Sequence, residues 1–231
     1  MSRLDPSLLA ALPPFSGMER DALAAMLAGA KPIRQPKDAY IFRQGEDAHA
    51  FFLLLDGYVR VVKLAPDGEQ VIVRFIASGE LLGIAKAIGR DRYPANAIAA
   101  ADCVLLAWPS RSWDAIVAAN PGFATNTYAM VGNRLLDTQD KVVELATERV
   151  EQRVANAVLN LARQTGRQTD EGTLIDFRIS RQDISEMTGT TLHTVSRLLS
   201  NWETKGWIKS GRQRITLVDS RTLATLATAR D

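Results

Sequence analysis

The hydrophobic and polar positions between residues 180 and 203 predict two short helices joined by a tight turn. This stretch reads SRQDISEMTGTTLHTVSRLLSNWE. Ser180 is a favourable N-cap for a first helix over residues 182–188, and Gly189 can adopt the positive φ that a sharp turn needs. Thr190 or Thr191 can cap a second helix, whose apolar residues recur three and four apart on one side. These residues are Val195, Leu198, Leu199 and Trp202. The pattern is typical of a helix-turn-helix.

The outward face of the second predicted helix carries residue types that read DNA bases. The apolar spacing leaves His193, Thr194, Ser196 and Arg197 outside. A bidentate Arg–guanine pair is the commonest specific contact in the major groove, and Ser, Thr and His can add polar contacts. The alternative is an ordinary helical hairpin whose polar face is solvated.

A short alternation of apolar and polar residues follows the two helices. Gly206 can end the second helix, and residues 207–209 and 214–217 then predict two strands, with Ser210-Gly211 as the turn. Between residues 178 and 216 there are seven Lys and Arg against three Asp and Glu, whereas the whole chain carries a net charge of only +2. Positive charge is therefore concentrated on a predicted winged helix-turn-helix, where it would complement DNA phosphates.

The N-terminal half has a different pattern. Residues 5–11 and 18–28 look helical and are separated by Pro13-Pro14, which breaks a helix. Short apolar runs then alternate with Gly, Asp and Pro turns. Strands are predicted over residues 40–42, 51–55, 58–64, 70–76, 95–100 and 103–108. Many short strands at regular spacing predict a rolled antiparallel sheet, which often has room for a ligand.

A long helix is predicted from Pro121 to about Arg149, with Pro121 in its first turn. One row of this helix steps three and four residues apart: Tyr128, Val131, Leu135, Thr138, Val142 and Leu145. A second row lies beside it: Ala129, Gly132, Leu136, Gln139, Val143 and Ala146. One row can pack on the roll, and the other then needs a partner. An identical helix is the simplest partner; burial against the chain's own C-terminal domain is the alternative.

The remaining segments complete an α+β chain in three parts: residues 1–120, 121–149 and 150–231. In the third part we expect a helix over residues 151–164, a polar loop over 166–172, a strand over 174–179 and a tail helix over 219–229 around the helix-turn-helix and wing. A dimer would place two DNA-reading helices on a twofold axis, which matches a palindromic operator.

Composition narrows the classes of function. Cys103 is the single cysteine and lies in an apolar run, so we expect a buried, inert thiol, no intramolecular disulfide and no four-cysteine iron–sulfur cluster within one chain. No apolar run reaches the roughly 18 residues of a membrane span, and no signal peptide is recognisable. We therefore expect a cytoplasmic protein. The sequence shows no spacing of residues typical of a catalytic site, so we do not expect an enzyme.

Four stretches together resemble the Crp/Fnr family, named after the cyclic AMP receptor protein and the fumarate–nitrate reduction regulator. They are LLLDGYVRVV, SGELLGIAKAIG, ERVEQRVANAVLNLA and GTTLHTVSRLLSNWE. The resemblance covers nearly the whole chain and implies a homodimeric transcription regulator, in which an effector at the roll reorients the DNA-binding domains. It also implies palindromic half-sites resembling TTG, with RNA polymerase as a further partner.

The resemblance assigns roles to residues of the helix-turn-helix. Base contacts are expected from His193, Ser196 and Arg197, with Arg197 on guanine and Ser196 by the neighbouring thymine. Phosphate contacts are expected from Ser180, Arg181, Gln182, Thr191, Thr194 and Lys209. His193 stands where the family usually carries Glu, so its imidazole should read the outer half-site less strictly or with a pH-dependent preference. The run LHTVSR resembles the branch that responds to nitric oxide and nitrite and is thought to use haem.

The segment that would hold an effector departs from the cyclic-AMP-binding members. Those members carry an Arg-Ser pair that clamps the phosphate, whereas residues 92–97 read RYPANA here. Cyclic AMP is therefore not expected, although Arg90 or Arg92 could replace the missing Arg. Pro94 is closer to the oxygen-sensing branch, but the N-terminal cysteines of that branch are absent. The resemblance places an effector pocket at Gly79, Glu80, Leu81, Leu82, Gly83, Arg92, Ala95 and Asn96.

His49 lies in a polar turn, where a surface histidine is the first interpretation and a haem ligand the second. Two functions remain open. One is a DNA-binding regulator that senses a small molecule or gas, such as nitric oxide through haem. The other is a regulator whose roll has no ligand and serves as a dimer scaffold or a polymerase contact.

Overall fold

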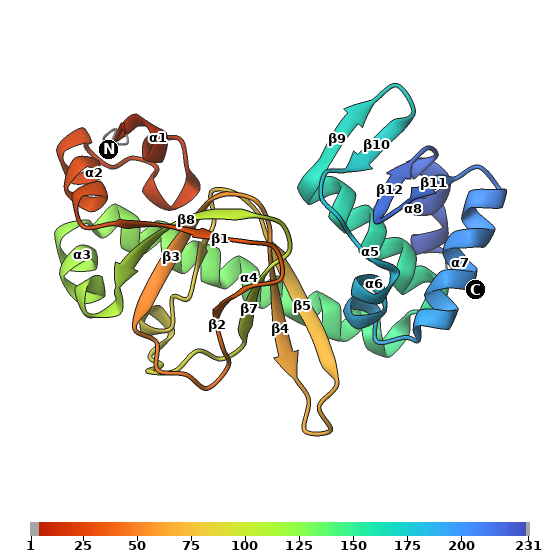
Figure 1. Cartoon of the computed structure of the whole chain (residues 1–231), viewed down its shortest axis with the longest axis horizontal. Helices are drawn as coiled ribbons and strands as arrows, with labels where there is room; N and C mark the ends of the chain where they lie inside the picture. Colours follow the sequence, from red (N-terminus) through yellow and green to blue (C-terminus); the bar gives the residue numbers. More distant parts are fainter. Residues whose placement is uncertain (1–4, 230–231) are drawn as a thin grey trace. The chain divides into compact units, whose positions relative to one another are not determined.

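The structure is a computed structural model that describes residues 5–229 and contains two compact units (Figure 1). One is formed by the chain up to Lys63 together with Phe75–Asp137, and the other by Leu64–Arg74 together with the chain from Thr138 onward. The α+β class with an N-terminal β-roll, a long helix and a C-terminal winged helix-turn-helix is confirmed.

The roll of the first unit consists of two four-stranded sheets. One has the order β1 (Lys31–Gln35), β8 (Cys103–Pro109), β3 (Ala50–Asp56) and β6 (Leu81–Leu82). The other has the order β2 (Tyr40–Phe42), β7 (Asn96–Ala99), β4 (Val59–Leu64) and β5 (Gln70–Ile76). The described pairs are antiparallel, and the register of β3 on β8 places Phe52 opposite Ala107.

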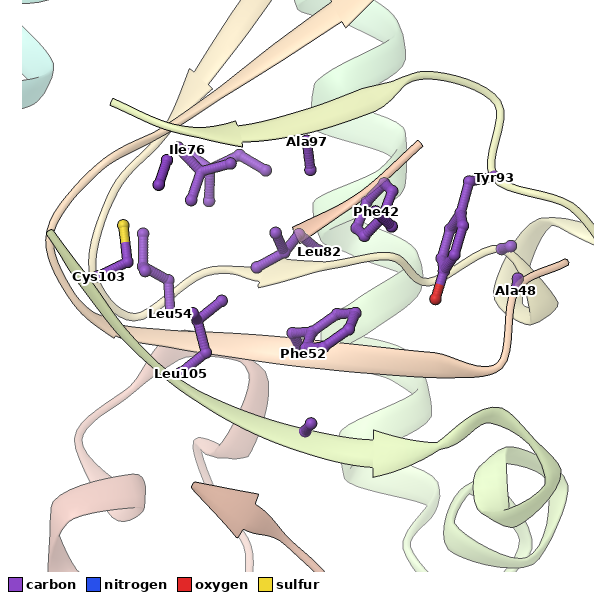
Figure 2. Close-up of a cluster of buried hydrophobic side chains, with 14 residues drawn as sticks. Phe42, Ala48, Phe52, Leu54, Ile76, Leu82, Tyr93, Ala97, Cys103 and Leu105 are labelled. Atoms are coloured by element: carbon purple, nitrogen blue, oxygen red, sulfur yellow. The ribbon is translucent and has the colours of Figure 1, made fainter. Parts of the chain in front are cut away.

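The central strands are apolar on both faces because both faces are covered. In β3, Phe52 and Leu54 point between the two sheets, where they pack in a buried cluster (Figure 2). Phe51 and Leu53 belong to a second cluster with residues of the helices on the outer face. Cys103 is buried in the inner cluster, as the sequence predicts, and its thiol donates to the carbonyls of Tyr58 and Ala101.

Short helices cover the outer face of the first sheet. They are α1 (Ser7–Ala10), α2 (Arg20–Ala28) and α3 (Trp113–Ala119), with 3₁₀ turns at Pro13–Phe15, Lys86–Ile88 and Ser110–Ser112. The indole Nε1 of Trp108 donates to the carbonyl of Met26 at 2.8 Å. The sequence pattern did not predict β1, β6 or α3. Strand β1 is a polar edge strand containing Pro32, and β6 is only two residues long.

Helix α4 (Pro121–Thr147) carries Phe123 and Thr127 on its buried face, and Val131 packs on the outer cluster of the roll. The expectation that one of the two predicted rows covers the roll is therefore wrong. Apart from Val131, the large apolar members of both rows are 45–62% exposed. They are Tyr128, Leu135, Leu136, Val142, Val143 and Leu145. These six residues are called the exposed stripe below.

The second unit is built on α5 (Val150–Thr165), which starts a new helix after Glu148 and Arg149. It contains α6 (Arg181–Thr188), α7 (Leu192–Thr204) and α8 (Ser220–Thr228). Its sheet has the order β11 (Ile208–Gly211), β12 (Arg214–Leu217), β10 (Gly172–Ile175) and β9 (Gly166–Thr169).

Three sequence predictions for this unit are wrong. The strand predicted over residues 174–179 is β10, which covers Gly172–Ile175 and ends before residue 176. The polar stretch 166–172, predicted as a loop, forms β9 and pairs with β10, because an exposed edge strand needs no apolar residues. The wing turn lies at Arg212-Gln213 rather than at Ser210-Gly211, because Gly211 still pairs with Arg214. Gln213 adopts the positive φ of 59° that this turn requires.

Candidate nucleic-acid interface

The first helix of the helix-turn-helix is held by a reciprocal cap. The Asp183 backbone N–H donates to Ser180 Oγ at 3.0 Å, and the Ser180 N–H and hydroxyl both donate to Asp183 Oδ2. Gly189, with φ 59°, then turns the chain in the left-handed region. The hydroxyl proton of Ser180 is thus committed to the cap, so Ser180 can offer a phosphate little more than its place at the helix start.

The second helix, α7, begins with a cap of the same kind. The Thr194 N–H donates to Thr191 Oγ1 at 3.1 Å, and the two hydroxyls lie 2.9 Å apart. Both threonines were expected to contact phosphates, and in this structure their hydroxyls are hydrogen-bonded to each other. The predicted inward face is confirmed: Val195, Leu198, Leu199 and Trp202 are all buried.

The opposite side of α7 is largely exposed to solvent. His193 and Arg197 are exposed, while Ser196 is half-buried. Sequence reasoning missed Leu192, which is the first residue of α7 and is 45% exposed. A turn of 3.6 residues places Leu192, Ser196 and Ser200 beside His193 and Arg197. Leu192 could have been found from the sequence, because it is an apolar residue that does not belong to the three-and-four spacing of the buried side of this helix.

A hollow of about 370 Å³ lies between the start of α6, the start of α7 and the wing. Arg181 and Gln182 line it from the helix side, and Arg214 and Gly211 line it from the wing. The N-terminus of a helix favours anions, and two guanidinium groups add positive charge at this place. The arrangement is suited to a backbone phosphate.

Lys209 of the wing, which was expected at a phosphate, has an ion-pair partner within the chain. Lys209 Nζ lies 2.7 Å from Glu171 Oε1, in the turn between β9 and β10. The exposed basic residues of the wing that the sequence analysis did not single out are Arg212 and Arg214. They lie at the wing tip, between β11 and the start of β12.

Most of the residues expected at an effector pocket are buried or have partners within the chain. Leu81 and Leu82 are buried in the two clusters on either side of the first sheet, and Asn96 Oδ1 accepts from the backbone N–H of Gln44. Gly79 and Gly83 take positive φ values of 90° and 69°. Ala95 is also buried.

Glu80 is bound within the chain. Its Oε1 accepts from the Ala77 N–H at 3.0 Å, and its Oε2 lies 3.2 Å from Arg134 Nη2 on α4. Arg134 Nη2 also donates to the Leu81 carbonyl at 2.6 Å. The Glu80 carboxylate, which was expected to contact an effector, is thus paired with Arg134 and links the roll to α4.

His49 and Arg92 line one open hollow of about 540 Å³ at the end of the roll. The rings that line it, Phe42, Phe52 and Tyr93, are already buried against one another. The hollow is open, and beside the exposed His49 its lining carries the charged side chains of Glu46, Asp47 and Arg92, which suit an apolar haem plane poorly. These residues do not fit a haem, and among residues 5–229 no three His, Cys, Asp or Glu side chains are grouped to hold a metal ion.

A capped helix-turn-helix with a basic wing and an exposed polar face on its second helix defines the class of protein: a winged-helix DNA-binding protein. Two domain models match the chain in this order, "Cyclic nucleotide-binding domain" over residues 32–120 and "Crp-like helix-turn-helix domain" over residues 152–226. The chain belongs to the Crp/Fnr family of transcription regulators, which are not enzymes.

Relatives match along most of the chain. The CRP-like cAMP-activated global transcriptional regulator of Mycobacterium tuberculosis H37Rv is 24% identical over 92% of this chain and 95% of that protein. The fumarate and nitrate reduction regulatory protein of Salmonella typhimurium is 25% identical over 90% of this chain and 82% of that protein. The structure of FixK2 from Bradyrhizobium japonicum is similar with a TM-score of 0.77 and 27% identity, covering 87% of this chain and 99% of that chain.

Proposed function

We propose that the protein is a homodimeric, cytoplasmic regulator that binds palindromic operators with TTG-like half-sites and contacts RNA polymerase. The observation that carries the proposal is the outer face of α7, where Leu192, His193, Ser196 and Arg197 share one side of a helix whose other side is fully buried. A rigidly packed helix with such a face can enter the major groove. In the described part of the chain, no helix has the length and apolar character needed to cross a membrane.

In this proposal Arg197 reads guanine through a bidentate pair, Ser196 lies by the neighbouring thymine, and His193 reads the outer half-site. Arg181, Gln182 and Arg214 hold a phosphate at the hollow beside α6. Arg212 reaches the backbone from the wing tip. Lys209 adds less, because Glu171 already partners it.

The exposed stripe supports dimerisation through α4. Six large apolar side chains on one helix, each at least 45% exposed, are costly to leave in water. A second copy of the same stripe, related by a twofold axis, would bury both copies at once. Such a dimer would present two copies of α7 to the two halves of a palindromic site.

For the roll, the packing supports the version of the function in which no effector is needed. Fourteen buried side chains fill the space between the two sheets. Nitric oxide sensing through haem finds no support at His49, and cyclic AMP finds no Arg-Ser pair. A cyclic nucleotide bound through Arg92 would also have to displace Asp47, which lies 3.4 Å from Arg92 Nε.

Selection of binding sites from random duplexes tests the proposal. The wild-type protein should select a palindrome. Arg197→Ala should weaken binding by about 1–3 kcal/mol and relax preference at one base pair of each half-site. Arg212→Ala is the matched control: it should weaken binding to all sequences alike and lower the salt dependence. Selection of no sequence by the wild-type protein would contradict the proposal.

A further inference from the structure

Tyr93 places an aromatic side chain inside the roll. It is 5% exposed, and its ring stacks on Phe42 with centroids 3.9 Å apart and an interplanar angle of 14°. Phe42 in turn stacks on Phe52 at 5.9 Å. Figure 2 shows these three rings at one end of the inner cluster, with Tyr93 entering from outside the strands. The row joins β2 of one sheet to β3 of the other.

The phenol hydroxyl of Tyr93 makes two hydrogen bonds to the protein backbone, one as donor and one as acceptor. Tyr93 Oη donates to the Ala50 carbonyl at 2.7 Å and accepts from the Ala50 N–H at 3.2 Å. Strand β6 pairs with β3 only at Phe52 and Leu53, so no neighbouring strand serves Ala50 on that side. Without this hydroxyl, both backbone groups of the half-buried Ala50 would lose a hydrogen-bond partner, which is costly.

Gly83 leaves room for the two phenylalanine rings beside Tyr93, and backbone hydrogen bonds hold Tyr93 itself. A Cβ on Gly83 would lie 3.1 Å from both Phe42 and Phe52 and 3.2 Å from the Ala50 carbonyl. The Tyr93 N–H donates to the Glu46 carbonyl at 3.0 Å, and the Gly45 N–H donates to the Tyr93 carbonyl at 2.9 Å. The side chain is therefore anchored at its backbone and at its hydroxyl.

From these contacts we infer that Tyr93 is a tethered ligand. Its phenol occupies a phenol-specific site between the two sheets and holds the roll in the DNA-binding state without an added effector. Removing the side chain would create a site for a free phenol, with the Ala50 backbone as its hydrogen-bond partner and Phe42 as its stacking partner. The inference rests on the proposed DNA-binding function.

The test uses the full-length chain with Tyr93→Ala, phenol as the probe and benzene as the matched control that lacks the hydroxyl. We expect Tyr93→Ala to lower Tm by roughly 10 °C and to weaken operator binding about tenfold or more. Millimolar phenol should raise Tm and restore operator affinity in this variant, whereas benzene should do so less. Phenol should change neither quantity in the wild-type protein.

Three results would overturn the inference: stabilisation of the wild-type protein by phenol, operator binding by Tyr93→Ala equal to wild type, or restoration of Tm by phenol without restoration of operator affinity. If Tyr93→Ala does not fold, Tyr93→Phe keeps the ring and removes only the hydroxyl. It should bind operator more weakly and gain nothing from phenol, and wild-type affinity in this variant would also count against the inference. Failure of the wild-type protein to bind any operator would instead reject the proposed function.

Discussion

Lys209 Nζ and Glu171 Oε1 lie 2.7 Å apart and join the wing to the turn between β9 and β10. Both side chains are more than half exposed, so the pair contributes little to folding stability. We expect the pair to matter instead for DNA binding, because it places a carboxylate beside a lysine that we propose would otherwise face phosphates.

Glu171→Gln should therefore free Lys209 for the DNA backbone. We expect affinity to rise for specific and random duplexes alike, and the slope of log K against log salt to steepen by up to about 0.9. Titrations at several salt concentrations would measure both effects. Lys209→Gln should matter little in the wild-type chain and more in Glu171→Gln; an equal effect in both backgrounds would show that the ion pair does not compete with DNA.

Leu192 should contact the C5 methyl group of a thymine, because it is an exposed apolar residue at the start of α7. Replacing the contacted thymine by uracil, which lacks that methyl group, should cost the wild-type protein about 1 kcal/mol. Leu192→Ala should lose this discrimination and bind both operators alike. Scanning each thymine of the selected operator in this way would locate the contact, and equal sensitivity in both proteins would exclude Leu192 from the interface.

His193 is exposed on the same face of α7, where the family usually carries Glu. A neutral imidazole offers one donor and one acceptor, whereas a carboxylate only accepts. His193→Glu should therefore sharpen preference for a base with an exocyclic amino group in the outer half-site. Site selection with both proteins would decide this: identical preferences at every position would mean that residue 193 does not face the bases.

The exposed stripe on α4 should be the dimer contact. Leu135→Lys combined with Val142→Lys would place charges in an apolar seam and should yield monomers with weak operator binding. Asn133→Lys is the control, because Asn133 is exposed on α4 outside the stripe. Sedimentation velocity would compare the three proteins. If the double variant remained a dimer, the exposed stripe would not be the dimer contact.

Tyr93 should make stability depend on alkaline pH. Burial raises the pKa of its phenol above the ordinary value of 10.0, although the bond to Ala50 acts in the opposite direction. The folded state therefore favours the neutral phenol, and its contribution is complete below pH 10 and is lost as pH rises above it. Denaturant unfolding of the wild type and Tyr93→Phe should give a constant difference in unfolding free energy below that pH and a shrinking one above it. Tyr128→Phe, at an exposed position, is the control.

Much of the DNA-binding unit could be predicted because its signals are local. Ser180 and Gly189 mark a cap and a turn, and the spacing of Val195, Leu198, Leu199 and Trp202 determines which side of α7 is buried. Capping and helical periodicity depend on residues a few positions apart, so the amino-acid sequence alone determined the helix-turn-helix and its outer face.

Only the tertiary structure decided the rest, because it depends on residues that are distant in the chain. Asn96 lies in the segment predicted to hold an effector, but pairing across the roll brings it to Gln44, and the same pairing brings Tyr93 to Ala50. Lys209 meets Glu171 only because β11, β12 and β10 form one sheet. Hydrogen bonds, stacking and charge pairing act over a few ångströms, so the residues available to an effector or to DNA depend on which distant neighbours already occupy them.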